Sequence, residues 1–260
     1  MTPLSGLLKV PVFGVGPLVR QTESETNQDT KSMMKWFDKQ PKESVVYVSF
    51  GSGGTLSYDQ LKELAFGLEL TEKRFIWALR APRGETANVA FFTTGCSDRF
   101  DEIQKQLPEG FIERIKNVGM LVQEWAPQVN VLKHPSIVCF ILHCGWGSVL
   151  ESLTNGVPII GWPLYAEQSM NATLLVEDLG VAVKTIVVGR EEIASLVKKV
   201  ILVGRNMMER VEEIKDSEEK ALCEGGFSYR TLSKVAKIIN KQDFISLSKN
   251  VDTRVEIKDK

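Results

Sequence analysis

The sequence lacks a net charge, a regular cysteine spacing and a long apolar run. Lysine and arginine number 32 against 33 acidic residues, giving a formal net charge of -1, so no basic field attracts nucleic acid or an anionic membrane. The four cysteines form no CxxC pair, which favours neither a disulfide framework nor a zinc site and indicates a reducing compartment. No stretch of about 18 uninterrupted apolar residues and no cationic leader is present, so we expect a cytoplasmic protein without a membrane span.

Predicted strands and helices alternate along most of the chain. Short β-branched and aromatic runs predict strands, and three- and four-residue apolar spacing predicts helices. The predicted strands are 44–50, 74–79, 119–125, 136–143, 157–163 and 181–188. The predicted helices are 57–70 with a Ser57–Gln60 capping box, 127–134, 148–155, 165–179, 190–203, 205–222 and 229–242. The alternation predicts an α/β fold with a doubly wound parallel sheet, whose ligands bind beyond the carboxyl ends of the strands.

Residues 139–151, "CFILHCGWGSVLE", lie at one of those strand ends. Gly145 and Gly147 can adopt backbone conformations closed to other residues, and a helix expected to begin near Ser148 would aim free amide groups outward. With His143 and the Ser148 hydroxyl, these amides predict a site for a phosphate. The alternative is a tight turn, with Glu151 serving only in a Ser148–Glu151 capping box.

A nicotinamide-dependent oxidoreductase is a competing hypothesis for this junction. Its dinucleotide fingerprint requires G-x-G-x-x-G, but Leu150 stands where the third glycine belongs. The fingerprint also requires an acidic residue after the first strand and helix, and the sequence has none in that context. Both departures disfavour an oxidoreductase.

Residues 125–168 read "WAPQVNVLKHPSIVCFILHCGWGSVLESLTNGVPIIGWPLYAEQ". This stretch resembles the donor-binding box of plant secondary-product glycosyltransferases, UDP-sugar-dependent enzymes that glycosylate small phenolics and other metabolites. Its Trp-Ala-Pro-Gln opening, His-Cys-Gly-Trp centre and closing Glu-Gln all match. The resemblance implies the Rossmann-like C-terminal domain of a GT-B glycosyltransferase, which binds the donor while a second, N-terminal domain binds most of the acceptor.

The resemblance also implies roles for individual residues. Trp125 would stack on uracil, the Ala126 backbone would pair with the base edge, and Gln128 and Glu151 would bond the ribose hydroxyls. The expected diphosphate contacts are Ser52, His143, Trp146, Gly147 and Ser148. Glu167 and Gln168 would hold the sugar, with Gln168 indicating glucose, and Ala166 would face the acceptor. The structural alternatives are core packing for Trp125, helix capping for Glu151 and a simple loop for Ser52, and Trp162 is open to assignment as core.

Two departures from the family pattern affect the expected activity. The family usually has Asn where this chain has Gly147. The side-chain amide that would bond the phosphate is therefore missing, whereas the backbone amide remains. The family's catalytic histidine and its orienting aspartate belong to the N-terminal domain, and no residue here matches either. His134 and His143 both lie inside the donor box, so neither is a credible base. We therefore expect no catalytic residue in this chain, no metal and no cofactor, and expect the 260 residues to be part of a longer protein.

The combined hypothesis is the donor-binding half of an inverting UDP-glucose-dependent glucosyltransferase. Its expected domains are 1–31 as the end of the N-terminal domain with a linker, including the polar stretch 21–31, then 32–245 as the UDP-sugar-binding domain and 246–260 as a polar tail. The expected partners are a UDP-sugar and a small phenolic acceptor, such as a flavonoid, an anthocyanidin, a monolignol or a simple phenol, with no nucleic acid. The alternative is a non-catalytic UDP-sugar-binding module.

Overall fold

The computed structural model describes residues 12–19, 28–52, 55–80, 103–123, 126–185 and 189–239. The chain divides into two compact units, a larger one of Val19–Lys215 and a smaller one of Met1–Leu18 with Asp216–Lys260. Trp125, the segment 81–102 and the predicted tail 246–260 lie outside the described residues. All other predicted site residues belong to the larger unit.

The larger unit is built on a parallel sheet, as predicted. Its strands are β1 (Val45–Ser49), β2 (Arg74–Leu79), β3 (Gly119–Gln123), β4 (Ile137–Leu142), β5 (Ile159–Gly161) and β6 (Ala182–Lys184). They are arranged in the order β3-β2-β1-β4-β5-β6, and every neighbouring pair is parallel. The strand order reverses between β1 and β4, which is where a doubly wound sheet opens a crevice for a ligand.

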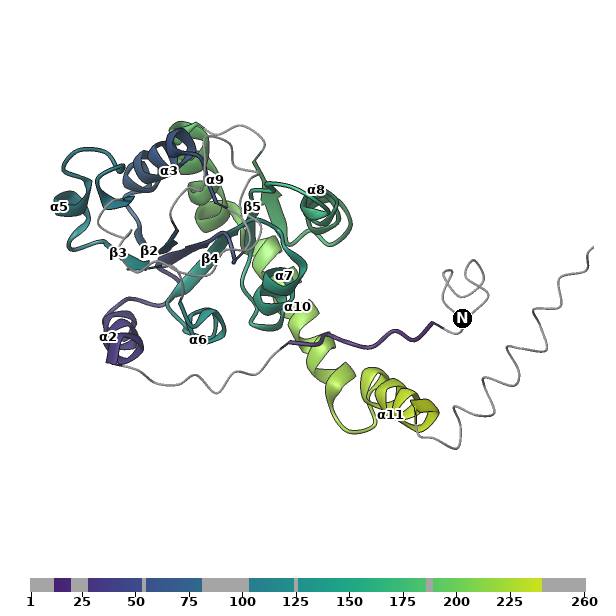
Figure 1. The fold of residues 1–260 in the computed structure, drawn as a ribbon. Coiled ribbons are helices and arrows are strands. Elements are labelled where there is room, and N and C mark those ends of the chain that lie inside the picture. Colours follow the sequence, from purple (N-terminus) through teal and green to yellow (C-terminus); the bar gives the residue numbers. More distant parts are fainter. Residues whose placement is uncertain are drawn as a thin grey trace, which may run out of the picture. The chain divides into compact units, whose positions relative to one another are not determined.

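Helices cover both faces of this sheet (Figure 1). The helices are α2 (Gln28–Phe37), α3 (Tyr58–Thr71), α5 (Phe111–Ile115), α6 (Gln128–Leu132), α7 (Trp146–Thr154), α8 (Gln168–Thr173), α9 (Arg190–Val203), α10 (Arg205–Leu222) and α11 (Phe227–Ile239). Buried side chains of α3, α5 and α9 pack on one face, and those of α2, α6, α7 and α8 pack on the other. Successive β1 residues alternate between the two cores, because side chains of a strand point to opposite faces. Among the described residues, no helix is long and apolar enough to cross a membrane.

One predicted helix has the expected start, and another has a different geometry from the predicted one. The capping box of α3 is confirmed, since the Ser57 hydroxyl accepts the Gln60 N–H and the Gln60 side chain accepts the Ser57 N–H. The predicted helix 165–179 is instead α8 followed by a π-helix, Leu174–Asp178, in which the Leu179 N–H donates to the Leu174 carbonyl at 3.0 Å. The spacing of apolar residues does not reveal that this hydrogen bond joins residues five apart, as in a π-helix, and not four apart, as in an α-helix.

Helix α2 was not predicted, and its first turn overlaps the stretch 21–31 that was expected to be a linker. The helix begins at Gln28 and buries Met33 and Phe37, which are one turn apart, against the sheet. Lys31, Ser32 and Lys35 are exposed. Only two apolar residues of this helix are buried, which leaves a weak signal in the sequence.

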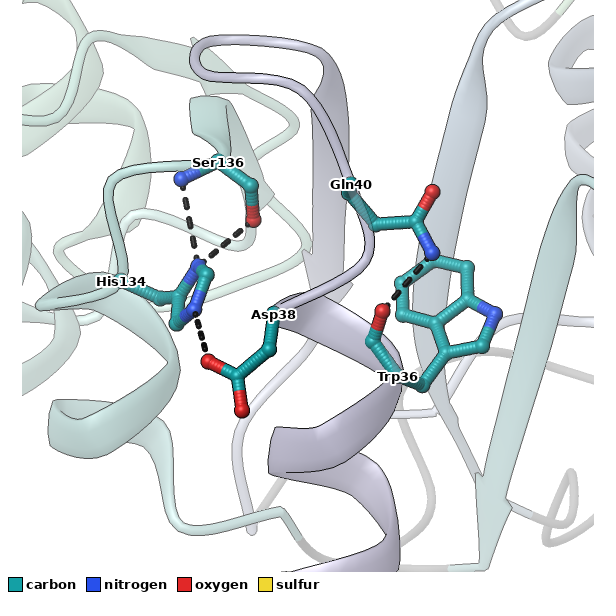
Figure 2. Close-up of polar contacts among 5 residues, drawn as sticks. All are labelled: Trp36, Asp38, Gln40, His134 and Ser136. Carbon is teal, nitrogen blue, oxygen red and sulfur yellow. Dashed lines mark hydrogen bonds and ion pairs between the residues drawn. The ribbon is translucent and has the colours of Figure 1, made fainter.

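His134 fixes α2 to the turn between α6 and β4 (Figure 2). Its ring stacks on Phe37 with centroids 5.1 Å apart. Its Nδ1 accepts the Ser136 N–H at 3.2 Å and lies 2.8 Å from the Ser136 hydroxyl, and its Nε2 lies 3.4 Å from an Asp38 carboxylate oxygen. This histidine thus has a structural place in the fold, in agreement with its exclusion as a catalytic base.

In the smaller unit, the segment 12–18 contacts α11. The Ser228 hydroxyl donates to the Gly16 carbonyl, and the Lys234 ammonium lies 5.4 Å from the centroid of the Phe13 ring. Helix α11 begins at Phe227, two residues before the predicted start. These contacts lie within the smaller unit, and none of the predicted site residues takes part in them.

Candidate functional site

The loops that follow β1 and β4 meet around the ring of His143. In the β1–β4 ladder Ser49 pairs with Leu142, so both strands end at the same edge. A Cβ at Gly51, which has φ +69°, would lie 2.5 Å from His143 Cε1, and a Cβ at Gly145 would collide with His143 Nε2. The ring therefore occupies a slot between two glycine backbones. A side chain at either glycine position would collide with the ring in this arrangement.

His143 is neutral at physiological pH. Its side chain is buried, and within the described residues its Nδ1 has no hydrogen-bond partner. Burial lowers the pKa of His143 to about 4, against a smaller opposing effect of the Glu167 charge. A neutral imidazole offers a ligand one N–H group and no positive charge, so His143 can bind an anion only as a hydrogen-bond donor.

The start of α7 supplies amide groups at the same place. Gly145 is an N-cap in extended conformation without a side-chain cap, and the first helical bond runs from the Val149 N–H to the Gly145 carbonyl at 3.0 Å. The amides of Trp146, Gly147 and Ser148 precede that bond and so have no acceptor within the helix. Together with the helix dipole they form a site suited to an anion.

The predicted helix start at Ser148, and with it the Ser148–Glu151 capping box, is wrong. Trp146 and Gly147 are already helical, because the extended Gly145 is the N-cap, and Ser148 is the third helical residue. Glu151 instead accepts a hydrogen bond from Gln128 Nε2 at 2.5 Å. Its carboxylate therefore does not cap its own helix.

Gln128 joins α6 to α7 through a polar cluster. Its Nε2 donates to the Ser148 hydroxyl at 3.0 Å as well as to Glu151, and its Oε1 accepts the Tyr47 hydroxyl at 3.3 Å. The three residues Gln128, Ser148 and Glu151 are partly buried. A carboxylate and a carboxamide held side by side can bond two adjacent hydroxyl groups of a ligand.

Tyr47 was missed in the sequence because it reads as one more aromatic residue of a buried strand. Its ring is stacked on Phe140 with centroids 4.5 Å apart, as that reading implies. Only the tertiary arrangement brings its hydroxyl to Gln128. A tyrosine among the β-branched residues of a strand was the available signal, since a buried tyrosine hydroxyl needs a partner.

The segment before α8 holds the remaining predicted residues. Ala166, with φ +53°, and Glu167 are exposed, whereas Gln168 is buried. The Gln168 Oε1 accepts the N–H groups of Leu164 and Tyr165 at 2.9 and 3.0 Å. The oxygen of this side chain thus holds the turn before α8.

The other predicted residues fall into three groups. Ser52 is exposed in the loop after β1, Ala126 is buried just before α6, and Trp146 is 45% exposed at the start of α7. Trp162 is in the core, edge-on to Phe50 with centroids 5.4 Å apart. Trp125 lies outside the described residues, so its place is not part of this geometry.

Within the described residues, neither a metal centre nor a cavity elsewhere involves the predicted site residues. Within the described ranges no group of three or more His, Cys, Asp or Glu side chains could hold a metal ion. A cavity of about 660 Å³ between α3 and the segment 105–109 is lined by none of the predicted site residues, and Arg114 at its wall forms a two-point ion pair with Glu69.

The buried neutral His143 predicts a pH-dependent stability. Its folded-state pKa of about 4 lies below the ordinary 6.5, so the unfolded chain binds more protons between these values. Stability is complete above pH 6.5 and falls as the pH drops toward 4, by about 3 kcal/mol in unfolding free energy. Chemical denaturation of the wild type and of His143→Gln across this range measures the difference, because the contributions of the carboxylates cancel between the two proteins.

The same substitution at His134 is the control, since His134 is the chain's other histidine. Identical pH dependence in the wild type and His143→Gln would contradict the assignment of a neutral, buried His143.

Known proteins resemble this chain in sequence and in structure. The chain is 52% identical over 238 residues to anthocyanidin 3-O-glucosyltransferase 5 of Manihot esculenta, which covers 88% of this chain and 48% of that protein. It is 43% identical over 235 residues to hydroquinone glucosyltransferase of Rauvolfia serpentina, with 88% and 49% covered. The crystal structure of TcCGT1 in complex with UDP superposes with a TM-score of 0.84 at 44% identity, covering 92% of this chain and 51% of that one.

The chain thus spans about half the length of these relatives. Residues 19–218 match the family model described as UDP-glucoronosyl and UDP-glucosyl transferase. This match includes the whole parallel sheet and every residue of the candidate site. The chain therefore belongs to the UDP-glucoronosyl and UDP-glucosyl transferase family.

Proposed function

We propose that the edge of the sheet at β1 and β4 binds the nucleotide of a UDP-sugar. The observation that carries the proposal is the meeting, at one edge, of the uncapped start of α7, the buried His143 ring and the Gln128–Glu151 pair. Amides at a helix start suit the diphosphate, and the carboxylate and carboxamide suit the ribose hydroxyls. The base of the nucleotide then lies beyond the ribose, and the sugar lies beyond the diphosphate.

For the remaining contacts we propose the roles that the resemblance to the donor-binding box implies. Trp125, next in sequence to the buried Ala126, stacks on uracil, and the Ala126 backbone pairs with the base edge. His143, Trp146, Gly147 and Ser148 bind the diphosphate, assisted by Ser52 from the loop after β1. Glu167 and Gln168 bind the sugar, which Gln168 indicates to be glucose. Ala166 beside them faces the acceptor.

For the whole protein we propose transfer of glucose from UDP-glucose, with inversion, to a hydroxyl of a small phenolic compound in the cytoplasm. The relatives named for anthocyanidin and hydroquinone glucosylation support this acceptor class. This chain spans about half of their length. The residues 32–245 would form the donor domain, 1–31 the end of the preceding domain with its linker, and 246–260 a tail. The group that activates the acceptor would belong to the half of the relatives that this chain does not match.

Calorimetric titration of the 260-residue chain with UDP, UDP-glucose and NADH tests the nucleotide site. We expect both uridine nucleotides to bind and NADH not to bind. Gln128→Ala should weaken UDP binding about tenfold, because a hydrogen bond to a charged or polar ligand group and the ordering of Glu151 are both lost. Trp125→Ala should weaken it further, since base stacking is lost.

Gln40→Ala is the matched control, because the Gln40 amide also bonds inside the protein, to the Trp36 carbonyl at 2.7 Å (Figure 2), but away from the site. A folded chain that binds no uridine nucleotide, or UDP binding that is equally strong in Gln128→Ala and the wild type, would contradict the proposal.

Gly147→Asn should tighten UDP binding. A Cβ at Gly147 meets no atom within 4 Å, so the larger side chain can be accommodated at the start of α7 and can add a hydrogen bond to the diphosphate. A bond to a charged group contributes roughly 1.5–3 kcal/mol, which corresponds to an affinity gain of about tenfold or more. The same calorimetric titration measures the gain.

Gly180→Asn is the control for this change. Gly180 is equally open, and its φ of +66° is one that asparagine adopts more readily than most residues. Its substitution should leave UDP binding unchanged. An unchanged UDP affinity in Gly147→Asn would refute the role given to this position.

A further inference from the structure

A buried asparagine on α8 holds the peptide that precedes α7. Asn171 is 6% exposed, and its Nδ2 donates to the Cys144 carbonyl at 2.9 Å. Cys144 lies between the end of β4 and the N-cap Gly145, and its φ of +61° places it in the left-handed region. Residues with side chains rarely adopt this conformation, so the surrounding structure must maintain it.

Two separate contacts constrain Cys144. Its fully buried side chain packs next to β5, since a Cβ at Gly161 would lie 2.7 Å from the Cys144 sulfur. That packing fixes the side chain but leaves the Cys144–Gly145 peptide able to rotate. The Asn171 amide fixes the carbonyl of this same peptide, and so sets the plane in which the chain enters α7.

The orientation of this peptide controls the groups that face the ligand. A trans peptide is planar, so its N–H points opposite to its carbonyl. With the Cys144 carbonyl held by α8, the Gly145 N–H points away from α8, and the amides of Trp146, Gly147 and Ser148 follow from the extended N-cap. The Gly145 backbone also forms one wall of the slot that holds the His143 ring.

We infer that Asn171 is a positioning residue for the diphosphate: by fixing the Cys144–Gly145 peptide, it orients the amides at the start of α7 and the ring of His143. The inference rests on the proposed nucleotide site. Asn171 follows the predicted sugar-binding pair Glu167 and Gln168 by one turn of the same segment, so it also ties the sugar side of the site to the phosphate side.

The test compares UDP with uridine, which has no phosphate. Asn171→Leu keeps a side chain of similar size but removes the N–H donors, and Asn171→Ala also removes the bulk. In both variants the Kd of UDP should rise about tenfold, the effect expected when hydrogen bonds to a charged ligand are misaligned. The Kd of uridine, followed by NMR, should change by less than about twofold, since its contacts with Gln128 and Glu151 do not depend on this peptide.

Asn155→Ala is the matched control. The Asn155 Nδ2 also donates to a backbone carbonyl, that of Glu151 at 2.7 Å, but at the far end of α7. Its loss removes the same kind of bond and should leave the ratio of the UDP and uridine affinities unchanged. The backbone amide resonances of Gly145, Trp146 and Gly147 should move in Asn171→Leu and stay in place in Asn155→Ala.

Three results would overturn the inference. These are an unchanged UDP affinity in Asn171→Leu, an equal loss of UDP and uridine affinity, and an unfolded Asn171→Leu chain, which would show that the amide serves the fold alone. Failure of the proposed nucleotide site is a distinguishable result, because the wild-type chain would then bind neither UDP nor uridine.

Discussion

The pairing of β1 with β4 is the constraint on which the site depends. These two strands are neighbours in space although β2 and β3 lie between them in sequence, because the chain first extends the sheet in one direction and then returns to extend it in the other. The loops after β1 and β4 therefore lie next to each other at a common edge. The ring of His143 fills the space between them, and the glycines at positions 51 and 145 allow it to lie against backbone on both sides.

The proposed diphosphate site contains no fixed positive charge among its proposed residues. His143 is neutral because it is buried, and the other proposed phosphate contacts are the backbone amides at the start of α7 and the hydroxyls of Ser52 and Ser148. Partial charges of amides at a helix start take the place of lysine or arginine. The chain has a formal net charge of -1. An anion is therefore attracted by the amides at the site and not by a positive field over the whole surface.

Sequence reasoning predicted the architecture well because buried parallel strands leave a strong signal. Short apolar runs such as 74–79 and 136–143 contain β2 and β4 almost residue for residue. It also predicted a site at the carboxyl edge of the sheet, where the parallel topology brings the turns after β1 and β4 together. The resemblance of residues 125–168 to a donor-binding box added the chemistry, and the family assignment is confirmed.

What the sequence could not reveal depends on contacts between distant segments. Helix α2 was missed because few of its residues are buried, and the start of α7 was placed two residues late because Ser148 and Glu151 have the spacing of a capping box. Gln168 has the residue type expected of a sugar ligand, yet its oxygen also holds the turn before it. Asn171 lies outside the recognised box, and only the fold brings it to Cys144. For Glu151 and Asn171, the partner of a polar side chain is set by tertiary structure.

The most direct test of the central claim is a crystal structure of this chain with UDP bound. The account predicts that the diphosphate lies over the amides of Trp146, Gly147 and Ser148 beside His143, and that the ribose hydroxyls contact Gln128 and Glu151. A nucleotide bound at another edge of the sheet, or a diphosphate directed away from the start of α7, would contradict it.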